Sequence, residues 1–252
     1  MGSNRRMDHM TWPEFKEAKT RPVIVPIGST EQHGQHLPIG TDAVLATRVA
    51  EDLAERIDGT VLPTLSYGYK SKPLSGGGPL FPGTIDMNGV TVINQMHDVL
   101  SELIADGFTK IVVMNAHFEN EAFIVEAIDL VTRETGGVAT IVETNWWDPV
   151  PQSVIDKVFD GLVFLGWALE HAAVTETSLM LHYAPELVHM DRMVEEAGAT
   201  AKSYVRYPVR QGDVPAHGGL ANPAGSSAER GRLIAEACVD AVAEICAEEF
   251  GE

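Results

Sequence analysis

Short apolar runs alternate with longer amphipathic stretches over much of the chain. The short runs consist largely of Val, Ile and Leu, as in strands that are buried on both faces of a sheet. They predict strands at residues 23–27, 60–65, 110–115 and 138–143. The longer stretches repeat apolar residues every three or four positions, which predicts helices with one buried face at 42–57, 88–106 and 119–134. This alternation indicates an α/β fold with a largely parallel sheet and helices on both faces.

Cap signals place further helices toward both ends of the chain. Thr11 and Glu14 form a capping box, which predicts a short first helix. Ser226 and Glu229 form a second capping box, which opens a long final helix. Asp42 can cap the helix that it begins.

The remaining segments are less regular. Helices are predicted around 154–159 and over 170–182, whereas 186–223 shows too little periodicity for a prediction. Residues 66–83 are rich in Gly and Pro and form a long predicted loop. A loop of this length inside a compact domain is more often functional than not, and a disordered surface excursion is the alternative.

The 252 residues show no linker or internal repeat. Length alone leaves one large domain or two small ones open. We expect a single domain over residues 11–252 and interpret residues 1–10 as a tag or a disordered N-terminus.

The net charge of -18 argues against a nucleic-acid or anionic-lipid partner. No apolar run is long enough for a membrane span, and we expect a cytoplasmic protein. Cys238 and Cys246 lie eight residues apart on one predicted helix, too far apart for a disulfide, so both are expected to be core thiols.

Candidate metal ligands follow two of the predicted strands. Glu31 and His33 come after the first strand, and His117 and Glu119 come after the third. Asp42 begins the helix that follows the first pair. The carboxyl ends of parallel strands are where open α/β sheets bind ligands. Mixed carboxylate and imidazole donors without thiolate suit zinc or manganese, and a pair of such ions is typical of metal-assisted hydrolysis.

Each of these residues also has an ordinary structural interpretation. Asp42 alone would be a helix cap, and a lone histidine would more often be a hydrogen-bonded structural residue. The two glutamates alone would be solvated surface groups. The repeat of a Glu/His pair at two strand ends is what favours a metal site.

Five segments together resemble a known family. In chain order they read GSTEQHGQHLPIGTD (28–42), YGYKSKPLSGGG (67–78), FPGT (81–84), NAHFEN (115–120) and GWALEHAAVTETSLML (166–181). In these motifs the chain is similar to the creatininase family, the metal-dependent creatinine amidohydrolases. The resemblance covers nearly the whole chain.

The resemblance implies a three-layer α/β/α fold, a homohexamer and two divalent metal ions, zinc and/or manganese. By this analogy Glu31, Asp42 and His117 would bind one ion, and His33, Asp42 and Glu119 the other. Water activated by the ions would open a small cyclic amide, with creatinine the first candidate. Glu119 would help orient that water.

The resemblance also implies roles on the substrate side. His171 matches the histidine that transfers a proton to the leaving nitrogen, and Glu170 supports it. The residues expected to contact substrate are Ser75, Gly76, Gly77, Phe118, Trp147 and Trp167. Without the resemblance, both tryptophans would be taken as core aromatics.

Two residues depart from the creatinine-hydrolysing pattern. Phe118 stands where a tyrosine is usual, and Ala168 stands where an aspartate is usual. Both changes remove polar contacts, so a different small ring or a formamide-type substrate is an alternative. A non-catalytic metal-binding homologue is a further hypothesis, against which the retained His171 argues.

Overall fold

The computed structural model describes residues 5–72, 76, 78–196, 199–200, 202–210 and 212–251. Within these residues the strands form a four-stranded parallel sheet in the order β2-β1-β3-β4. The strands are β1 (Val23–Ile27), β2 (Thr60–Val61), β3 (Lys110–Asn115) and β4 (Thr140–Asn145). The predicted parallel sheet is therefore confirmed, and the two central strands are β1 and β3.

Strand β2 is much shorter than the predicted 60–65. Pro63 interrupts it, because proline has no N–H to donate to the neighbouring strand. The chain then returns to the sheet through a single bridge between Leu65 and Ile27. Gly28 N donates to the Leu65 carbonyl over 3.0 Å, so the end of β1 is held on this side as well.

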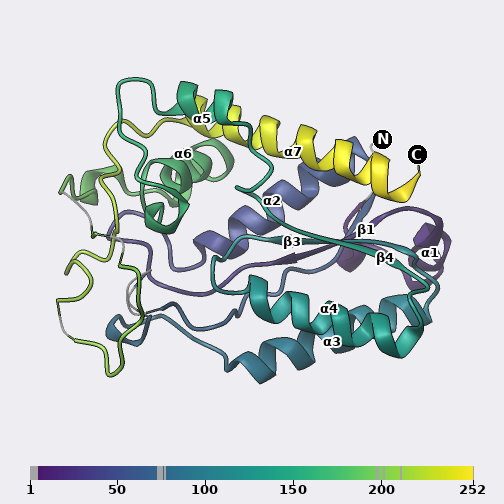
Figure 1. Ribbon diagram of the computed structural model, residues 1–252. Coiled ribbons are helices and arrows are strands. Elements are labelled where there is room, and N and C mark those ends of the chain that lie inside the picture. The colour runs from purple at the N-terminus through teal and green to yellow at the C-terminus, as the bar shows by residue number, and fades with distance from the viewer. Residues whose placement is uncertain are drawn as a thin grey trace.

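Helices cover both faces of the sheet (Figure 1). On one face lie α2 (Thr41–Arg56), α5 (Gln152–Val158), α6 (Val174–Tyr183) and α7 (Ala228–Phe250). On the other lie α3 (Gly89–Ala105) and α4 (Glu121–Thr135), with α1 (Trp12–Glu17) adding Phe15 to the same core. Short 3-10 helices are Met7–His9, Ala18–Thr20, Gly78–Leu80, Trp167–Leu169, Pro185–Leu187 and Met190–Arg192. The arrangement is a three-layer α/β/α sandwich.

Alternate side chains of the central strands supply two separate cores. Ile24 and Val112 pack with α2, α6 and α7, whereas Val23, Val25 and Val113 pack with α3 and α4. All five are fully buried, as expected for parallel strands covered on both faces. Cys238 and Cys246 are buried in the first of these cores and are not joined in a disulfide, as predicted.

Three helix starts can be compared with their cap signals. The Thr11–Glu14 capping box is confirmed. The final helix is capped by Ser227, one residue later than predicted. The Ser227 side chain accepts a hydrogen bond from Arg230 N. Asp42 does not cap α2: the cap position is Gly40, and the Asp42 carboxylate is turned toward two histidines.

The start of the described chain contacts the domain, within the segment that was interpreted as a tag or a disordered N-terminus. Val61 N donates to the Arg5 carbonyl over 2.8 Å, and Arg6 pairs with Glu51 at 2.8 Å. These contacts hold residues 5–10 against β2 and α2, and residues 1–4 lie outside the described residues. In the described part of the chain, no helix is long and apolar enough to cross a membrane.

We predict that Gly231→Ala destabilises the protein. Gly231 lies where α7 crosses α6, and an added Cβ would stand 2.0 Å from the Ser178 carbonyl oxygen. The helices would have to separate, which we expect to lower the free energy of unfolding by about 1–3 kcal/mol. Chemical denaturation measures this change.

Gly40→Ala serves as the control, because nothing lies within 4 Å of a Cβ there. Its effect should stay below about 1 kcal/mol, the usual size of a change at a helix cap. Equal stability of Gly231→Ala and wild type would contradict the close packing of α6 on α7.

Candidate metal centre

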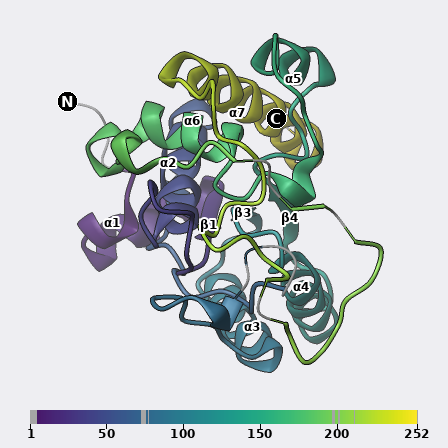
Figure 2. The same cartoon turned by 90° about the vertical axis from the view of Figure 1, so that its left-hand side faces the viewer.

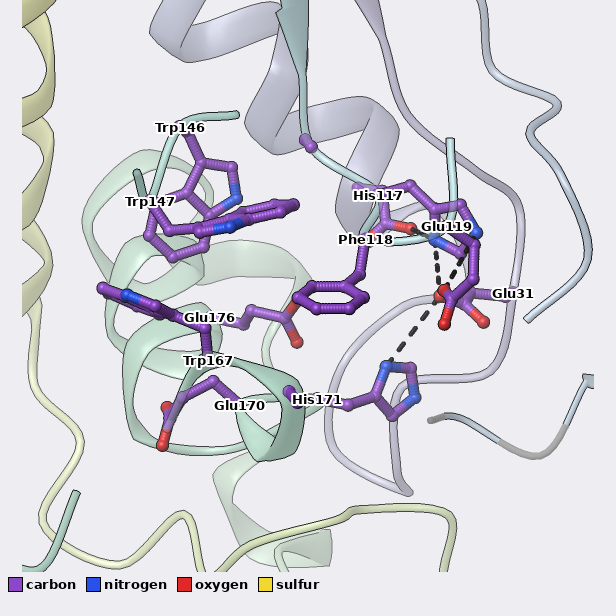
Figure 3. Close-up of a pocket in the computed structure, with 13 residues that line it drawn as sticks. Glu31, His117, Phe118, Glu119, Trp146, Trp147, Trp167, Glu170, His171 and Glu176 are labelled. Atoms are coloured by element: carbon purple, nitrogen blue, oxygen red, sulfur yellow. Dashed lines mark ion pairs between the residues drawn. The ribbon is translucent and has the colours of Figure 1, made fainter. Parts of the chain in front are cut away.

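Four potential ligands converge from three segments at the carboxyl end of the sheet. Figure 3 labels two of them, Glu31 and His117. Glu31 and His33 lie on the loop after β1, Asp42 lies in the first turn of α2, and His117 follows β3. Each is no more than 2% exposed. The predicted convergence of the two strand ends is observed, because β1 and β3 are direct neighbours.

The first group of donors is formed by Glu31, Asp42 and His117. His117 Nδ1 lies 3.0 Å from Glu31 Oε1 and 3.1 Å from Asp42 Oδ2. His117 Nε2 lies 2.8 Å from the Tyr69 carbonyl oxygen, to which it can only donate. In the neutral ring, Nδ1 therefore keeps its lone pair toward the carboxylates, as a metal ligand requires.

The second group is formed by His33, Asp42 and Glu176. His33 Nε2 lies 2.9 Å from Asp42 Oδ1 and 3.6 Å from Glu176 Oε2. The other ring nitrogen, Nδ1, lies 3.1 Å from the Glu31 carbonyl oxygen and donates to it. Both histidines are thus oriented by a backbone carbonyl, and Asp42 is shared between the two groups.

Glu176 is the donor that the sequence analysis missed. It lies in the first turn of α6, a helix whose residues 174–180 are all buried. Glu119 does not belong to either group, and its Oε2 lies 3.5 Å from His117 Nε2, at the edge of the ring opposite Nδ1. A single carboxylate among the uncharged residues of a helix start was the sequence signal that could have identified Glu176.

The charges and the unpartnered polar atoms of these residues suit the binding of cations. Within the described residues, Glu31 Oε2, His33 Nε2 and Asp42 Oδ2 are buried without a hydrogen-bond partner. Burial raises the pKa of Glu31 to about 7. Burial lowers the pKa values of His33 and His117, but the adjacent carboxylates outweigh it and raise both well above the ordinary value. The donor types and their unpartnered atoms therefore suit two adjoining divalent ions.

His171 and Glu170 lie beside this cluster but precede α6, which begins only at Val174 and not at residue 170. His171 Nδ1 is 3.8 Å from Glu31 Oε1. Burial and the charge of His33 hold the pKa of His171 well below its ordinary value, so the ring is neutral. Glu170 accepts hydrogen bonds from Thr175 N and Oγ1 at 2.9 and 2.8 Å, and burial raises its pKa to about 7.

Aromatic side chains line the pocket opposite the ligands (Figure 3). Phe118 stacks on Trp147 with ring centroids 5.8 Å apart, and Trp146 meets Trp147 and Trp167 edge-on. Ala168 also lines this pocket. Trp147 and Trp167, which were expected to contact substrate, line this pocket. Trp146 also lines it and was not among the predicted residues.

The Gly-rich loop is only partly described. Ser75 and Gly77, both predicted to contact substrate, lie outside the described residues. Gly76 is described and buried, and an added Cβ there would stand 3.1 Å from Glu31 Oε2 and 3.2 Å from His171 Cε1. Gly76 therefore lies close against the ligand cluster, and its φ of +131° also favours glycine at this position.

Comparison with known proteins places this geometry in a family. A model described as creatininase, creatinine amidohydrolase, matches residues 8–246. The creatinine amidohydrolase of Pseudomonas putida is 41% identical over 249 residues, covering 96% of this chain and 95% of that protein. The mycofactocin precursor peptide peptidase of Mycolicibacterium smegmatis is 32% identical over 87% of this chain and 83% of that protein.

Solved structures agree with the sequence comparison. A manganese form of creatininase is 40% identical and superposes with a TM-score of 0.95 over 99% of this chain and 100% of that chain. A creatininase mutant of the Zn–Zn type is 39% identical, with a TM-score of 0.95 over 100% of both chains.

The fold and the buried donor cluster define an α/β protein with residues able to hold metal ions at the carboxyl end of a parallel sheet. More particularly, the chain belongs to the creatininase family, whose model and relatives it matches over nearly its whole length.

We predict that adding zinc to the metal-free protein near neutral pH releases protons. The raised pKa values of His33 and His117 mean that both rings carry an extra proton there, and a metal ion binds only the neutral ring. Fewer protons must leave as the pH rises, so zinc affinity should increase with pH. A pH indicator in weakly buffered solution measures the release.

His97→Gln is the control, because His97 pairs with Glu134 at the surface and shares no contact with the cluster. This variant should release as many protons as wild type. Zinc binding that is independent of pH across the neutral range would contradict the protonated state of the cluster.

Proposed function

We propose that the chain is a binuclear metal-dependent hydrolase that opens a small cyclic amide, with creatinine the first candidate substrate. The observation that carries the proposal is the pair of buried donor groups that share Asp42. The 41% identity to a creatinine amidohydrolase over nearly the full length supports the reaction class. Zinc and manganese are the proposed ions, since both are named for solved relatives.

The proposed ligand sets follow the geometry of the cluster. Glu31, Asp42 and His117 would hold one ion, and His33, Asp42 and Glu176 the other. Glu176 takes the place that the family resemblance suggested for Glu119. When bound there, divalent ions polarise a carbonyl group and lower the pKa of a water molecule.

Two residues of the chain are proposed to move the proton that amide hydrolysis requires. One proton of the attacking water must reach the leaving nitrogen. Glu119 is 5% exposed and lines the pocket beside His117, where its carboxylate can accept that proton and then release it to the leaving nitrogen. His171 lies across the pocket as a neutral ring and can hydrogen-bond the leaving nitrogen. Glu170 supports the segment through its two hydrogen bonds to Thr175.

The aromatic wall is proposed to receive the substrate ring. Phe118, Trp147 and Trp167 give flat faces on which a planar ring can stack. Enclosure by these side chains also keeps bulk water from the reacting groups. Gly76, together with Ser75 and Gly77, is proposed to border the substrate on the side of the Gly-rich loop.

The alternative substrate is a different small ring or a formamide-type compound. It is favoured by Phe118 and Ala168, which line the pocket without a hydroxyl or carboxylate to offer. A family relative that is named as a peptide peptidase shows that substrates vary within the fold. A non-catalytic metal-binding protein is the least favoured hypothesis, because such a protein has no need of His171.

A homohexamer and a cytoplasmic location are also proposed. Support for assembly comes from β4, which is an edge strand of the described sheet, and from the exposed Val138 just before it. Support for a reducing compartment comes from Cys238 and Cys246, which are buried and not joined in a disulfide.

We predict that Asp42→Ala removes most of the bound metal and the activity, because both donor groups lose their shared ligand. His171→Ala should keep its metal and lose roughly 10²- to 10⁴-fold in kcat, the usual effect of a lost proton-transfer group. Metal analysis and turnover of a cyclic amide panel, with and without a chelator, measure both effects. Normal metal occupancy in Asp42→Ala would contradict the shared site, and no metal-dependent turnover across the panel would contradict the proposed reaction.

We predict that the double variant Phe118→Tyr, Ala168→Asp raises kcat/KM for creatinine by roughly tenfold or more. A change of this size corresponds to the free energy of one hydrogen bond to a charged group. Ala247→Asp, on the exposed side of α7, is the matched control and should leave kcat/KM unchanged. An unchanged creatinine kcat/KM in the double variant would show that these two positions do not decide the substrate.

A further inference from the structure

Gln32 lies in the sequence between two proposed ligands, Glu31 and His33, and its amide contacts other residues. Its side chain is buried, with 5% of the residue exposed, and it reaches three other segments of the chain. The amide nitrogen Nε2 lies 2.6 Å from the Gly76 carbonyl oxygen and 2.9 Å from the Gly218 carbonyl oxygen. It also lies 2.9 Å from His171 Nε2. The amide therefore touches the Gly-rich loop, the segment before α7 and the proposed proton-transfer residue.

The surroundings leave one orientation for this amide. Two carbonyl oxygens can only accept, so the group that faces Gly76 and Gly218 is the NH2 group. On the other side, Gly34 N donates to Gln32 Oε1 over 2.9 Å. A flipped amide would place its oxygen against two carbonyl oxygens, and its NH2 group against a backbone N–H.

This orientation determines which nitrogen of His171 carries a proton. The two N–H groups of the Gln32 amide are shared among His171 Nε2 and the carbonyl oxygens of Gly76 and Gly218. An amide nitrogen cannot accept a hydrogen bond, so this contact favours His171 Nε2 with its lone pair toward Gln32. The proton of the neutral ring is then on Nδ1, the nitrogen that lies 3.8 Å from Glu31 Oε1 at the edge of the metal centre (Figure 3). A proton on Nε2 would point at the amide NH2 group and lose this contact.

The neighbours of Gln32 hold the amide in place. An added Cβ at Gly218 would stand only 1.9 Å from Gln32 Oε1, so the backbone approaches as closely as glycine permits. Gly218 also has a φ of +89°, which disfavours any other residue. Leu220 N donates to the His171 carbonyl over 3.1 Å, which ties the same segment to the histidine backbone.

We propose that Gln32 is a positioning residue, which fixes His171 as the neutral tautomer with Nδ1–H facing the metal centre and ties that ring to the loops at Gly76 and Gly218. His171 then meets the substrate as a hydrogen-bond donor, and Glu119 is the group ready to accept the proton of the attacking water. The kcat measurement below rests on the proposed function, whereas the tautomer measurement does not.

The test is the tautomer of His171 in the zinc-loaded protein. Long-range proton–nitrogen NMR on ¹⁵N-histidine-labelled protein distinguishes Nδ1–H from Nε2–H, and the His171→Asn variant identifies the signal among the nine histidines. We expect Nδ1–H in the wild-type protein. A wild-type signal of the Nε2–H form would overturn the proposal, and this spectrum requires no substrate.

Gln32→Met tests the cause, because methionine is similar in length but cannot hydrogen-bond. We expect the His171 signal to shift toward Nε2–H, and kcat to fall about 10- to 100-fold, as for other partners that orient an active-site imidazole. Bound zinc should be unchanged. An unchanged His171 tautomer in Gln32→Met would overturn the proposal even if kcat fell.

Asn120→Ala is the matched control. Asn120 is also a buried amide that joins loops, since it accepts from Tyr69 N at 2.8 Å and donates to the Gly28 carbonyl at 3.0 Å, but it does not contact His171. Its loss should lower stability and leave the His171 tautomer as in wild type. The same tautomer shift in both variants would assign the effect to general loosening and would overturn a specific role for Gln32.

Discussion

The architecture of the site depends on one buried carboxylate, that of Asp42, which is shared by two imidazoles. Asp42 Oδ1 lies 2.9 Å from His33 and Oδ2 lies 3.1 Å from His117. A carboxylate that is 1% exposed is costly unless it is paired, and the two rings outweigh the effect of burial and lower its pKa. Each ring comes from a different central strand, so this one group joins β1, β3 and α2.

Close approach of backbone makes that position available. A Cβ at Gly28 would lie 2.5 Å from the Asp42 carbonyl carbon and 2.6 Å from Ala43 N. Only glycine at the end of β1 lets the first turn of α2 come so near. The α6 helix then brings Glu176 from the same face of the sheet, and its position depends on the tight crossing of α6 and α7 at Gly231. Figure 2 shows these helices gathered on one side of the sheet.

The sequence predicts the parts of the site that follow strands and misses the part that depends on helix packing. Glu31 and His117 could be found because a strand end fixes where the next residues lie. Glu176 could not, because its place depends on how α6 packs over the sheet, and its helix shows no amphipathic period. The prediction that Asp42 can also cap α2 was wrong for a related reason: Ser, Asp and Asn at helix starts usually cap, and only tertiary contacts show otherwise. The short β2 and the ordered residues 5–10 likewise depend on contacts between distant segments.

The most direct measurement is the location of bound metal by anomalous X-ray diffraction from crystals grown with zinc. Two peaks are expected, one among Glu31, Asp42 and His117 and one among His33, Asp42 and Glu176. A single peak, or a second ion bound by Glu119 with Glu176 outside its reach, would contradict the shared-carboxylate centre.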